Sequence, residues 1–519
     1  MSTESAPTPA KRIADGYAVE GQALELGTVV VDGQTDPAAQ IRIPLATINR
    51  HGLVAGATGT GKTKTLQLIA EQLSAAGVPV LMADVKGDLS GLARPGEAND
   101  KTAARAKDTG DNWQATGFPV EFLSLGTDGV GVPIRATVAS FGPVLLSKVL
   151  GLNATQESTL GLIFHWAKEN NRSLVTVGQL RAVISHLTND EGKADLKSLG
   201  GVSSTTAGVI LRALVNLEGE GGDTFFGEPK LDPKDLLRAN DQGQGIISLL
   251  EFSGQSLRPV IFSTFLMWLL ADLFTELDEV GDVDKPKLVF FFDEAHLLFA
   301  DASKAFLEQV EQTVKLIRSK GVGVFFCTQL PTDLPNDVLS QLGARVQHAL
   351  RAFTPDDQKA LSKTVRTYPK TDVYDLESAL TSLGIGEAVV TVLSEKGAPT
   401  PVAWTRMRVP RSLMAAIGAD AVSAAAKSSP LQAKYGKTVE QESTPEPSPK
   451  GQDPQPGKPE PEYPALPDDY ELPPMPPPAA PKGPSMWEEV LKNPTVKSGI
   501  NTAIREAVRS VFGSGRRRR

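Results

Sequence analysis

Eight consecutive residues near the start of the chain follow the pattern of a phosphate-binding loop. Residues 56–63 read Gly-Ala-Thr-Gly-Thr-Gly-Lys-Thr and fill every position of the motif G-x-x-x-x-G-K-[ST]. In such a loop, successive backbone N–H groups surround the β-phosphate of a nucleotide, and glycine is needed where a side chain would block the approach. We predict that ATP binds here through nine residues: Gly56, Ala57, Thr58, Gly59, Thr60, Gly61, Lys62, Thr63 and Thr65.

Two side chains of this loop have separate chemical roles in the prediction. Lys62 can reach the β- and γ-phosphates, and the hydroxyl of Thr63 can ligate Mg²⁺. The context fits, because the short apolar run 51–55 precedes the loop as a strand and residues 64–73 have apolar positions at helical spacing. A helix that begins at the loop would direct the positive end of its dipole at the bound anion.

A pair of carboxylates supplies what hydrolysis needs beyond nucleotide binding. The apolar strand 289–292 ends in Asp293 and Glu294. Asp293 is placed to hold the hydration shell of Mg²⁺, and Glu294 is placed to polarise the attacking water. The competing interpretation is two solvated acids at the end of a strand. With the loop upstream, the pair indicates an ATPase that performs work.

Three further positions are weaker candidates. Gln329 follows the strand 322–327 and could sense the γ-phosphate or orient water, or it could only cap a loop. Arg318 stands at a helix end just before that strand; in a ring it could reach a neighbour's nucleotide, and otherwise it is a surface arginine. Arg345 and Arg351 compete for the same role.

The segment after the second expected strand also carries charge. Asp84 would lie on the same sheet edge as the nucleotide and could join the Mg²⁺ or water network. Lys86 could equally face a central channel. His296 follows the acid pair and is expected to start a helix rather than to catalyse.

Composition limits the class of protein. Hydrophobic residues at 40% and charged residues at 22% are typical of a soluble globular protein. The single cysteine, Cys327, excludes an internal disulfide framework and fits a reducing compartment. Residues 1–15 lack the apolar core of a signal peptide, and the apolar stretch 260–274 is too short to span a bilayer. These features predict a cytoplasmic protein.

The net charge of −8 excludes a generally basic surface that would coat duplex DNA. Contact with DNA would have to come from a local site, such as the central channel of a ring.

Strand and helix signals divide the chain into segments. Near-continuous apolar strands that alternate with helices predict a mainly parallel sheet covered on both faces. The expected segments are a disordered arm (1–15), a small β element (16–50), the first part of an ATPase core (51–139), a mainly helical insertion (140–240), the second part of the core (241–411), a tail with a proline-rich disordered linker (412–485) and a basic amphipathic helix (486–519).

The last segment has apolar residues at helical spacing with arginines between them and ends in four arginines. This helix could dock on its own ATPase body, contact a protein partner, touch an anionic membrane surface or grip nucleic acid. Docking on protein is slightly favoured.

Several segments together resemble the HerA-like branch of the HerA–FtsK ATPases, and most closely the DUF853 or YjgR-like "helicase HerA-like" proteins. The resemblance covers roughly residues 20–410. It rests on the segments 44–53, 83–91, 292–296, 327–329, 342–348 and 383–388.

The resemblance implies an α/β fold with a RecA-like P-loop NTPase core, and a homo-oligomer in the form of a hexameric ring. Such rings hydrolyse ATP with Mg²⁺ to move DNA or protein, with an arginine finger acting on the neighbouring subunit. One departure is visible, since HerA helicases carry an N-terminal β-barrel that recruits a nuclease and only about 50 residues precede the loop here.

Two hypotheses follow from the sequence. The first is a Mg²⁺-dependent ATPase that works as a DNA translocase or helicase-like motor. The alternative is a nucleotide-switched scaffold or envelope-associated ATPase that acts on a protein or lipid partner.

Overall fold

The computed structural model describes most of the chain up to residue 437. The described residues are 7–437 without 85–86, 128, 191, 196–200, 221, 223, 252–258, 282 and 301. The predicted proline-rich linker and the predicted helix at 486–519 lie outside this part of the chain, and so does Lys86.

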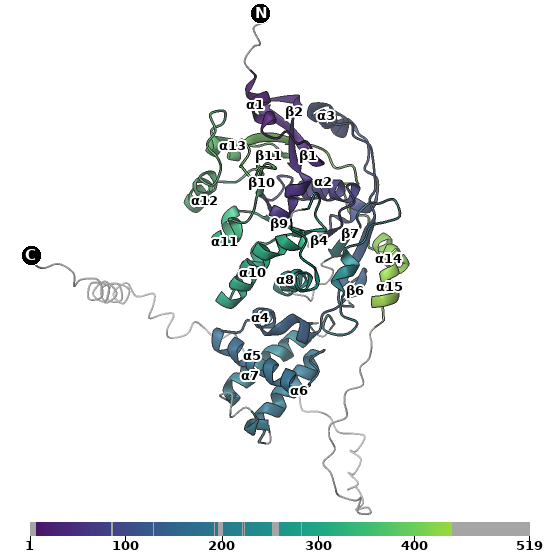
Figure 1. The fold of residues 1–519 in the computed structure, drawn as a ribbon, viewed down its shortest axis with the longest axis vertical. Helices are drawn as coiled ribbons and strands as arrows, with labels where there is room; N and C mark the ends of the chain where they lie inside the picture. The colour runs from purple at the N-terminus through teal and green to yellow at the C-terminus, as the bar shows by residue number, and fades with distance from the viewer. Residues whose placement is uncertain are drawn as a thin grey trace, which may run out of the picture. The chain divides into compact units, whose positions relative to one another are not determined.

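One 12-stranded sheet organises the described residues, in the order β2-β1-β12-β11-β10-β3-β9-β8-β4-β7-β5-β6 (Figure 1). The strands from β10 to β6 are all parallel to their neighbours, and the remaining strands pair antiparallel. The parallel strands are β10 (Ala344–Gln347), β3 (Gly52–Ala55), β9 (Val322–Thr328), β8 (Leu288–Phe292), β4 (Val80–Asp84), β7 (Ile247–Glu251), β5 (Val120–Leu125) and β6 (Val132–Ile134). The antiparallel strands are β11 (Glu387–Thr391), β12 (Ala403–Met407), β1 (Ala23–Val31) and β2 (Gln34–Pro44). The prediction of a mainly parallel α/β sheet is confirmed.

Helices cover both faces of the sheet, because successive residues of a buried strand point to opposite sides. In β3, Leu53 and Ala55 belong to one hydrophobic core, which also includes residues of α8 (Pro259–Glu276) and α10 (Lys304–Ile317). Val54 belongs to the other core, with residues of α2 (Lys62–Ala75). Shorter helices complete the layers: α3 (Asp100–Thr109), α9 (His296–Phe299), α11 (Asn336–Leu339), α12 (Pro355–Val365) and α13 (Leu376–Ser382).

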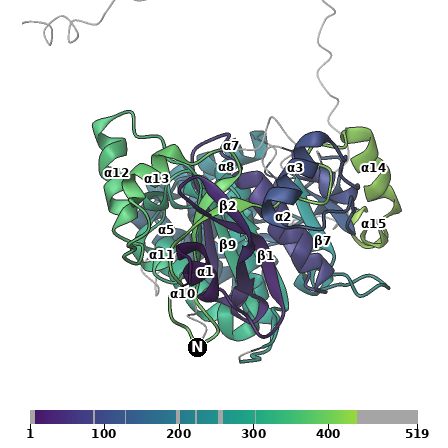
Figure 2. The same ribbon diagram turned by 90° about the horizontal axis from the view of Figure 1, so that it is seen from above.

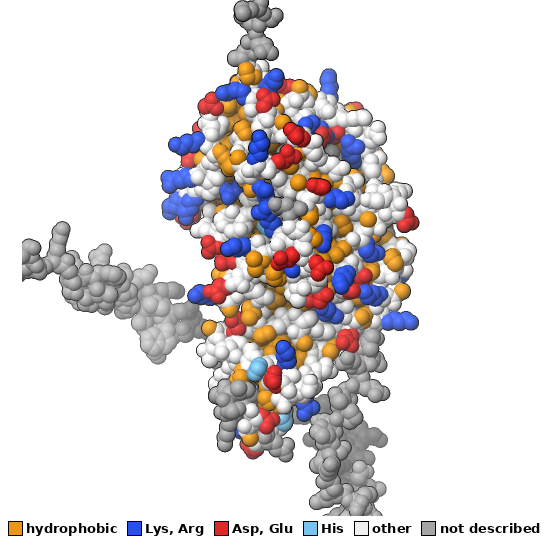
Figure 3. All heavy atoms as spheres, viewed as in Figure 1, with side chains coloured by type: hydrophobic (Ala, Val, Ile, Leu, Met, Phe, Trp, Pro, Cys, Tyr) orange, Lys and Arg blue, Asp and Glu red, His pale blue; other side chains and the backbone are white. Residues whose placement is uncertain are grey.

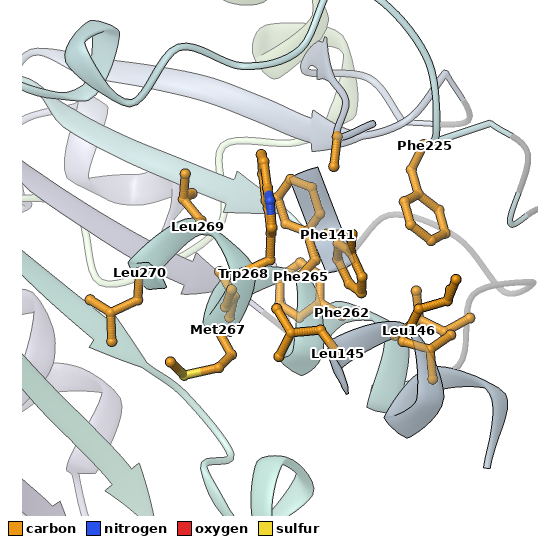
Figure 4. Packing of buried hydrophobic residues seen from close by; sticks show 14 of the residues in the cluster. Phe141, Leu145, Leu146, Phe225, Phe262, Phe265, Met267, Trp268, Leu269 and Leu270 are labelled. Carbon is orange, nitrogen blue, oxygen red and sulfur yellow. The ribbon is translucent and has the colours of Figure 1, made fainter. Parts of the chain in front are cut away.

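Residues 140–240 hold the helices of the expected insertion, which gather below α8 in Figure 1. They are α4 (Val138–Leu150), α5 (Ala154–Glu169), α6 (Val177–Thr188) and α7 (Ser204–Gly219). Phe141 of α4 stacks on Trp268 of α8 with ring centroids 6.3 Å apart, as Figure 4 shows. The helices therefore continue the core that contains Leu53 and Ala55. In the described part of the chain, no helix, α8 included, has the length and hydrophobicity needed to cross a membrane.

The prediction of a disordered arm at residues 1–15 is wrong for its second half. Helix α1 (Pro9–Asp15) begins after Thr8, whose hydroxyl accepts a hydrogen bond from the N–H of Lys11. Ile13 is buried, and the Tyr17 hydroxyl lies 2.8 Å from the carbonyl oxygen of Val390. A helix of seven residues is too short to show a clear period in the sequence, which is why it escaped prediction.

The small β element of residues 16–50 is the edge of the main sheet, because β1 pairs with β12. Gly27 permits this pairing: a Cβ atom there would lie 2.0 Å from the carbonyl oxygen of Arg406. Figure 2 shows β1, β2 and α1 together near the N-terminus.

The tail expected from residue 412 onward is folded as far as the structure describes it. Helices α14 (Ala419–Ser428) and α15 (Pro430–Tyr435) pack against β5 and β6. Tyr435 is fully buried, and its hydroxyl lies 2.5 Å from Oδ2 of Asp235. The boundary predicted at residue 411 is therefore too early.

Candidate functional site

The phosphate loop joins β3 to α2 at the carboxyl edge of the sheet. Gly56, Gly59 and Gly61 have φ values of 150°, 81° and 114°, which side chains rarely adopt. A Cβ atom on Gly56 would also approach Cβ of His348 to 2.6 Å. Two backbone hydrogen bonds anchor the loop to its neighbours. The N–H of Gly56 donates to the carbonyl of Thr328, and the N–H of Ala57 donates to the carbonyl of Ala349. Glycine is therefore required by conformation as well as by motif.

The loop has the properties of an anion-binding site. Lys62 begins α2, and its ammonium lies 2.7 Å from the carbonyl oxygen of Gly56 and 3.2 Å from that of Ala57. Thr58 and Gly59 are exposed, and Thr63 is half-buried in the first turn of α2. The N–H groups of that first turn have no partner within the helix and point along its dipole. A polyphosphate fits this combination of cation, amides and bare glycines.

The acid pair lies at the end of β8, with an unusual backbone. Glu294 has φ 47°, a left-handed conformation that is rare for residues other than glycine. Its N–H donates to Oδ1 of Asp293 over 2.9 Å, and its side chain is only 14% exposed. Oε2 of Glu294 lies 3.4 Å from Nδ1 of His296. Strained backbone of this kind concentrates at functional sites.

Cys327 of β9 connects the loop with the acid pair. Its thiol is buried and hydrogen-bonds Asp293. Burial raises the pKa of the Cys327 thiol well above its usual range; the charge of Asp293 raises it further, and that of Lys62 acts in the opposite direction. Lys62, Asp293 and Glu294 therefore all lie close enough to Cys327 to influence the charge of its thiol. The sequence alone gave no sign of this contact.

The parallel register of β3, β9 and β8 explains why the loop and the acid pair lie near one another. Ala55 of β3 pairs with Thr328 of β9, and Phe326 of β9 pairs with Phe292 of β8, so three strands end at the same edge. Gln329 follows β9 directly and is exposed at this edge, between the loop and the acid pair. The structure therefore brings the predicted loop, acid pair and amide together.

Two further carboxylates lie along the same edge of the sheet, at the ends of β4 and β7. Asp84 pairs in register with Glu251, and both are buried. Asp84 accepts hydrogen bonds from the N–H groups of Gly87 and Leu89 over 2.7 and 2.9 Å. Burial, followed by the charge of Asp84, raises the pKa of Glu251 to about 7. Sequence analysis missed Glu251, although an acid directly after an apolar strand was a recognisable signal.

Of the three arginine candidates, only Arg351 contacts the phosphate loop of its own chain. Arg318 precedes β9 and lies at the opposite, amino edge of the sheet, where its charge contributes to the lowered pKa of His51. Arg345 donates to the carbonyls of Thr367 and Leu339. Arg351 alone among the three touches the loop, since its Nη2 lies 3.3 Å from the carbonyl oxygen of Thr58.

His348 is a loop neighbour that sequence analysis did not single out. Its Nδ1 lies 2.8 Å from the carbonyl oxygen of Glu387, so Nδ1 must carry the proton and donate. Nε2 then accepts from the hydroxyl of Thr65 on α2, 2.9 Å away. Burial, and then the charge of Lys62, lowers the pKa of His348 to about 4, against the opposing effect of its backbone hydrogen bond. A neutral imidazole thus ties α2 to β10 and β11.

Fold and site together define a P-loop NTPase of the RecA-like type. Solved structures of the bacterial conjugative coupling protein TrwB share the fold: the unbound form has a TM-score of 0.51 at 15% identity and covers 79% of this chain and 94% of that chain. TrwB with the non-hydrolysable ATP analogue ADPNP has a TM-score of 0.50 at 16% identity and covers 77% and 98%. TrwB with ADP and Mg²⁺ has a TM-score of 0.50 at 16% identity and covers 77% and 97%.

The sequence profile of the family described as "Helicase HerA-like C-terminal" matches residues 30–519. The chain belongs to this family, which confirms the resemblance seen in the sequence. No curated protein sequence matches the chain.

The neutral His348 predicts an acid-sensitive fold. The folded state keeps His348 unprotonated down to a pKa of about 4, whereas an unfolded histidine binds its proton near 6.5. The unfolded state therefore holds more protons between these values, and the free energy of unfolding should fall as pH drops from 6.5 to 4, by up to roughly 3 kcal/mol from this group. His51 acts in the same direction, because burial lowers its pKa to about 4.

Denaturant unfolding at several pH values measures this effect in the wild type and in His348→Gln. The variant should show a shallower decline below pH 6.5. His165→Gln serves as the matched control, because His165 is exposed on α5, and it should keep the wild-type slope. If the free energy of unfolding fell equally steeply with pH in the wild type and in His348→Gln, the prediction that His348 is neutral in the folded state would be refuted.

Proposed function

We propose that this chain is a Mg²⁺-dependent ATPase that forms a hexameric ring and works as a HerA/FtsK-like DNA translocase or helicase-like motor in the cytoplasm. One observation carries the ATPase part: the glycine loop and the acid pair meet at one sheet edge, with Glu294 held in a left-handed conformation. Membership of the HerA-like family supports the motor.

Binding would begin at the loop. Lys62 leaves the carbonyls of Gly56 and Ala57 and pairs with the β- and γ-phosphates, which are stronger acceptors because they are charged. The amides of the first turn of α2 complete the cradle. His348 fixes Thr65, and with it this first turn, from the side. TrwB, whose fold is similar, has been solved with ADP and Mg²⁺.

Hydrolysis would use the acid pair. Thr63 and Asp293 would hold Mg²⁺, which supplies positive charge that offsets the charge of the phosphates. Glu294 orients water and accepts its proton as attack proceeds. The carboxylate is largely buried, and Nδ1 of His296 lies 3.4 Å from its Oε2. Gln329 contacts the γ-phosphate from the end of β9 and so distinguishes ATP from ADP.

Replacing Glu294 with Gln should abolish turnover and preserve binding. The amide keeps the size of the side chain and loses the proton acceptor, so the rate of phosphate release should fall about 10²–10⁴-fold. ATP affinity, measured by isothermal titration with Mg²⁺, should stay within about threefold of the wild type, since the loop is unchanged.

Glu308→Gln is the matched control, because Glu308 is an exposed acid on α10, away from the edge. It should turn over at the wild-type rate. Full activity of Glu294→Gln would show that another group is the base.

We include a ring in the proposal because Arg318 lies at the edge of the sheet opposite the loop and cannot reach the nucleotide of its own chain. As an arginine finger it would have to serve the nucleotide of a neighbouring subunit. Arg351 is the alternative that acts on its own loop, through its contact with Thr58.

DNA as the polymer is supported by a local basic surface on an acidic chain. The exposed side chains of α12 and the segment after it include Lys363, Arg366 and Lys370, and also Lys359, which pairs with the exposed Asp356 at the start of the helix. Basic side chains gather at α12 in Figure 3, whereas the rest of that face mixes both signs of charge. A cluster of this kind can contact phosphates without a basic surface elsewhere.

A ring-forming DNA motor predicts ATP turnover that rises several-fold with duplex or single-stranded DNA and falls steeply with added salt. In the same buffer, the mass in solution with an ATP analogue should be that of a hexamer. The matched variant Lys363→Glu/Arg366→Glu should lose the DNA response and keep the basal rate.

A monomer with slow turnover that DNA leaves unchanged would contradict the motor. If turnover or binding then responded to a protein partner or to anionic lipid vesicles, that result would favour the scaffold or envelope-associated ATPase.

A further inference from the structure

One carboxylate organises the turn that carries Gln329. Asp333 closes the short 3₁₀ turn Pro331–Asp333, which follows Gln329 directly after β9. Its Oδ2 accepts a hydrogen bond from the hydroxyl of Thr328 over 2.6 Å and another from the N–H of Leu330 over 2.9 Å. These two donors are the sequence neighbours of Gln329 on either side. A single oxygen atom therefore fixes the backbone before and after Gln329.

The turn is also closed by its own backbone and anchored in the core. The N–H of Asp333 donates back to the carbonyl of Leu330 over 3.0 Å. Pro331 is buried and has a φ angle restricted by its ring. Leu334, which comes directly after the turn, is buried in the hydrophobic core that includes residues of α8 and α10. The carboxylate of Asp333 thus belongs to a rigid unit.

The same hydrogen bonds connect the turn with the phosphate loop. Thr328 is buried, and its carbonyl accepts the N–H of Gly56 over 3.2 Å. Thr328 also pairs in register with Ala55 of β3, the strand that leads into the loop. Gln329 therefore follows a residue that is bound both to the loop and to Asp333. Its backbone keeps a fixed position relative to the phosphates that the loop would hold.

The side chain of Gln329 lacks such support of its own. It is exposed, and its amide forms no hydrogen bond within the part of the chain that the structure describes. The rotamers of a side chain are set relative to its backbone, so a fixed backbone limits where this amide can reach. A polar group that is already in position binds a developing or terminal charge at a lower cost than one that must be ordered first.

We propose that Asp333 is the positioning residue of the γ-phosphate sensor, because it holds the backbone from which the amide of Gln329 meets the terminal phosphate. This inference rests on the proposed function, in which Gln329 contacts the γ-phosphate. In this arrangement Asp333 does not touch the nucleotide and acts only through Gln329. Loss of Asp333 should therefore weaken binding of a triphosphate and spare binding of a diphosphate.

Isothermal titration of the full chain with ADP and with the non-hydrolysable ATP analogue ADPNP, each with Mg²⁺, measures the ratio of the two affinities. Asp333→Ala removes the shared acceptor, so ADPNP affinity should fall about tenfold, whereas ADP affinity should stay within about twofold of the wild type. Asp333→Asn should bring the ratio back to within about threefold of the wild type, because the amide oxygen can accept both hydrogen bonds. Retained ADP binding also shows that each variant is folded.

A double variant separates positioning from a general structural role. If Asp333 acts through Gln329, Gln329→Ala/Asp333→Ala should lose no more ADPNP affinity than Gln329→Ala alone. Losses that add would show that Asp333 acts by another route and would overturn the proposal. The matched control is Asp337→Ala, which removes an exposed acid on α11 and should keep the wild-type ratio.

The outcomes also distinguish this inference from the proposed function. If Gln329→Ala lowers the ratio while Asp333→Ala leaves it unchanged, or weakens both nucleotides equally, the positioning role alone is refuted. A ratio that Gln329→Ala does not change would contradict the γ-phosphate contact in the proposed function. A wild-type protein that binds neither nucleotide would contradict the ATPase itself.

Discussion

The common carboxyl edge of the parallel strands is the constraint on which the site depends. Residues that follow β3, β9, β8, β4 and β7 must lie at the same edge of the sheet, because adjacent parallel strands run in the same direction. Residues distant in sequence, such as Lys62, Asp293 and Gln329, are thereby placed within one region. Loss of register between β3, β9 and β8 would separate the loop from the acid pair.

Buried polar contacts fix the geometry that the register allows. His348 ties the first turn of α2 to β11 through two hydrogen bonds, and the thiol of Cys327 contacts Asp293 from the next strand. Glu71 of α2 accepts hydrogen bonds from the N–H groups of Arg411 and Ser412. Breaking such a contact leaves a buried polar group unpaired, at a cost of about 1–3 kcal/mol. Backbone hydrogen bonds to Thr328 and Ala349 therefore hold the loop, while His348 and the segment after β12 hold the helix α2 that follows it.

The sequence was sufficient for the parts of this arrangement that have strong local patterns. The loop motif, the apolar strand before Asp293 and the helical periods of residues 140–240 each predicted structure that is present. Helix α1 and helices α14 and α15 escaped prediction because they are short, and tertiary packing rather than local pattern stabilises them. His348 became visible only through its neighbours, whereas Glu251, an acid at the end of an apolar strand, was overlooked.

The central claim is that the loop and the acid pair form one site for a nucleotide with its metal. Binding of Mn²⁺, which can replace Mg²⁺ and is detected by electron paramagnetic resonance, tests the claim most directly when it is measured with and without ATP. The account predicts one tightly bound ion per chain that requires ATP and that loses about tenfold or more in affinity in both Thr63→Ala and Asp293→Asn. Binding of Mn²⁺ that ignores ATP, or that is unaffected by the loss of Asp293, would contradict it.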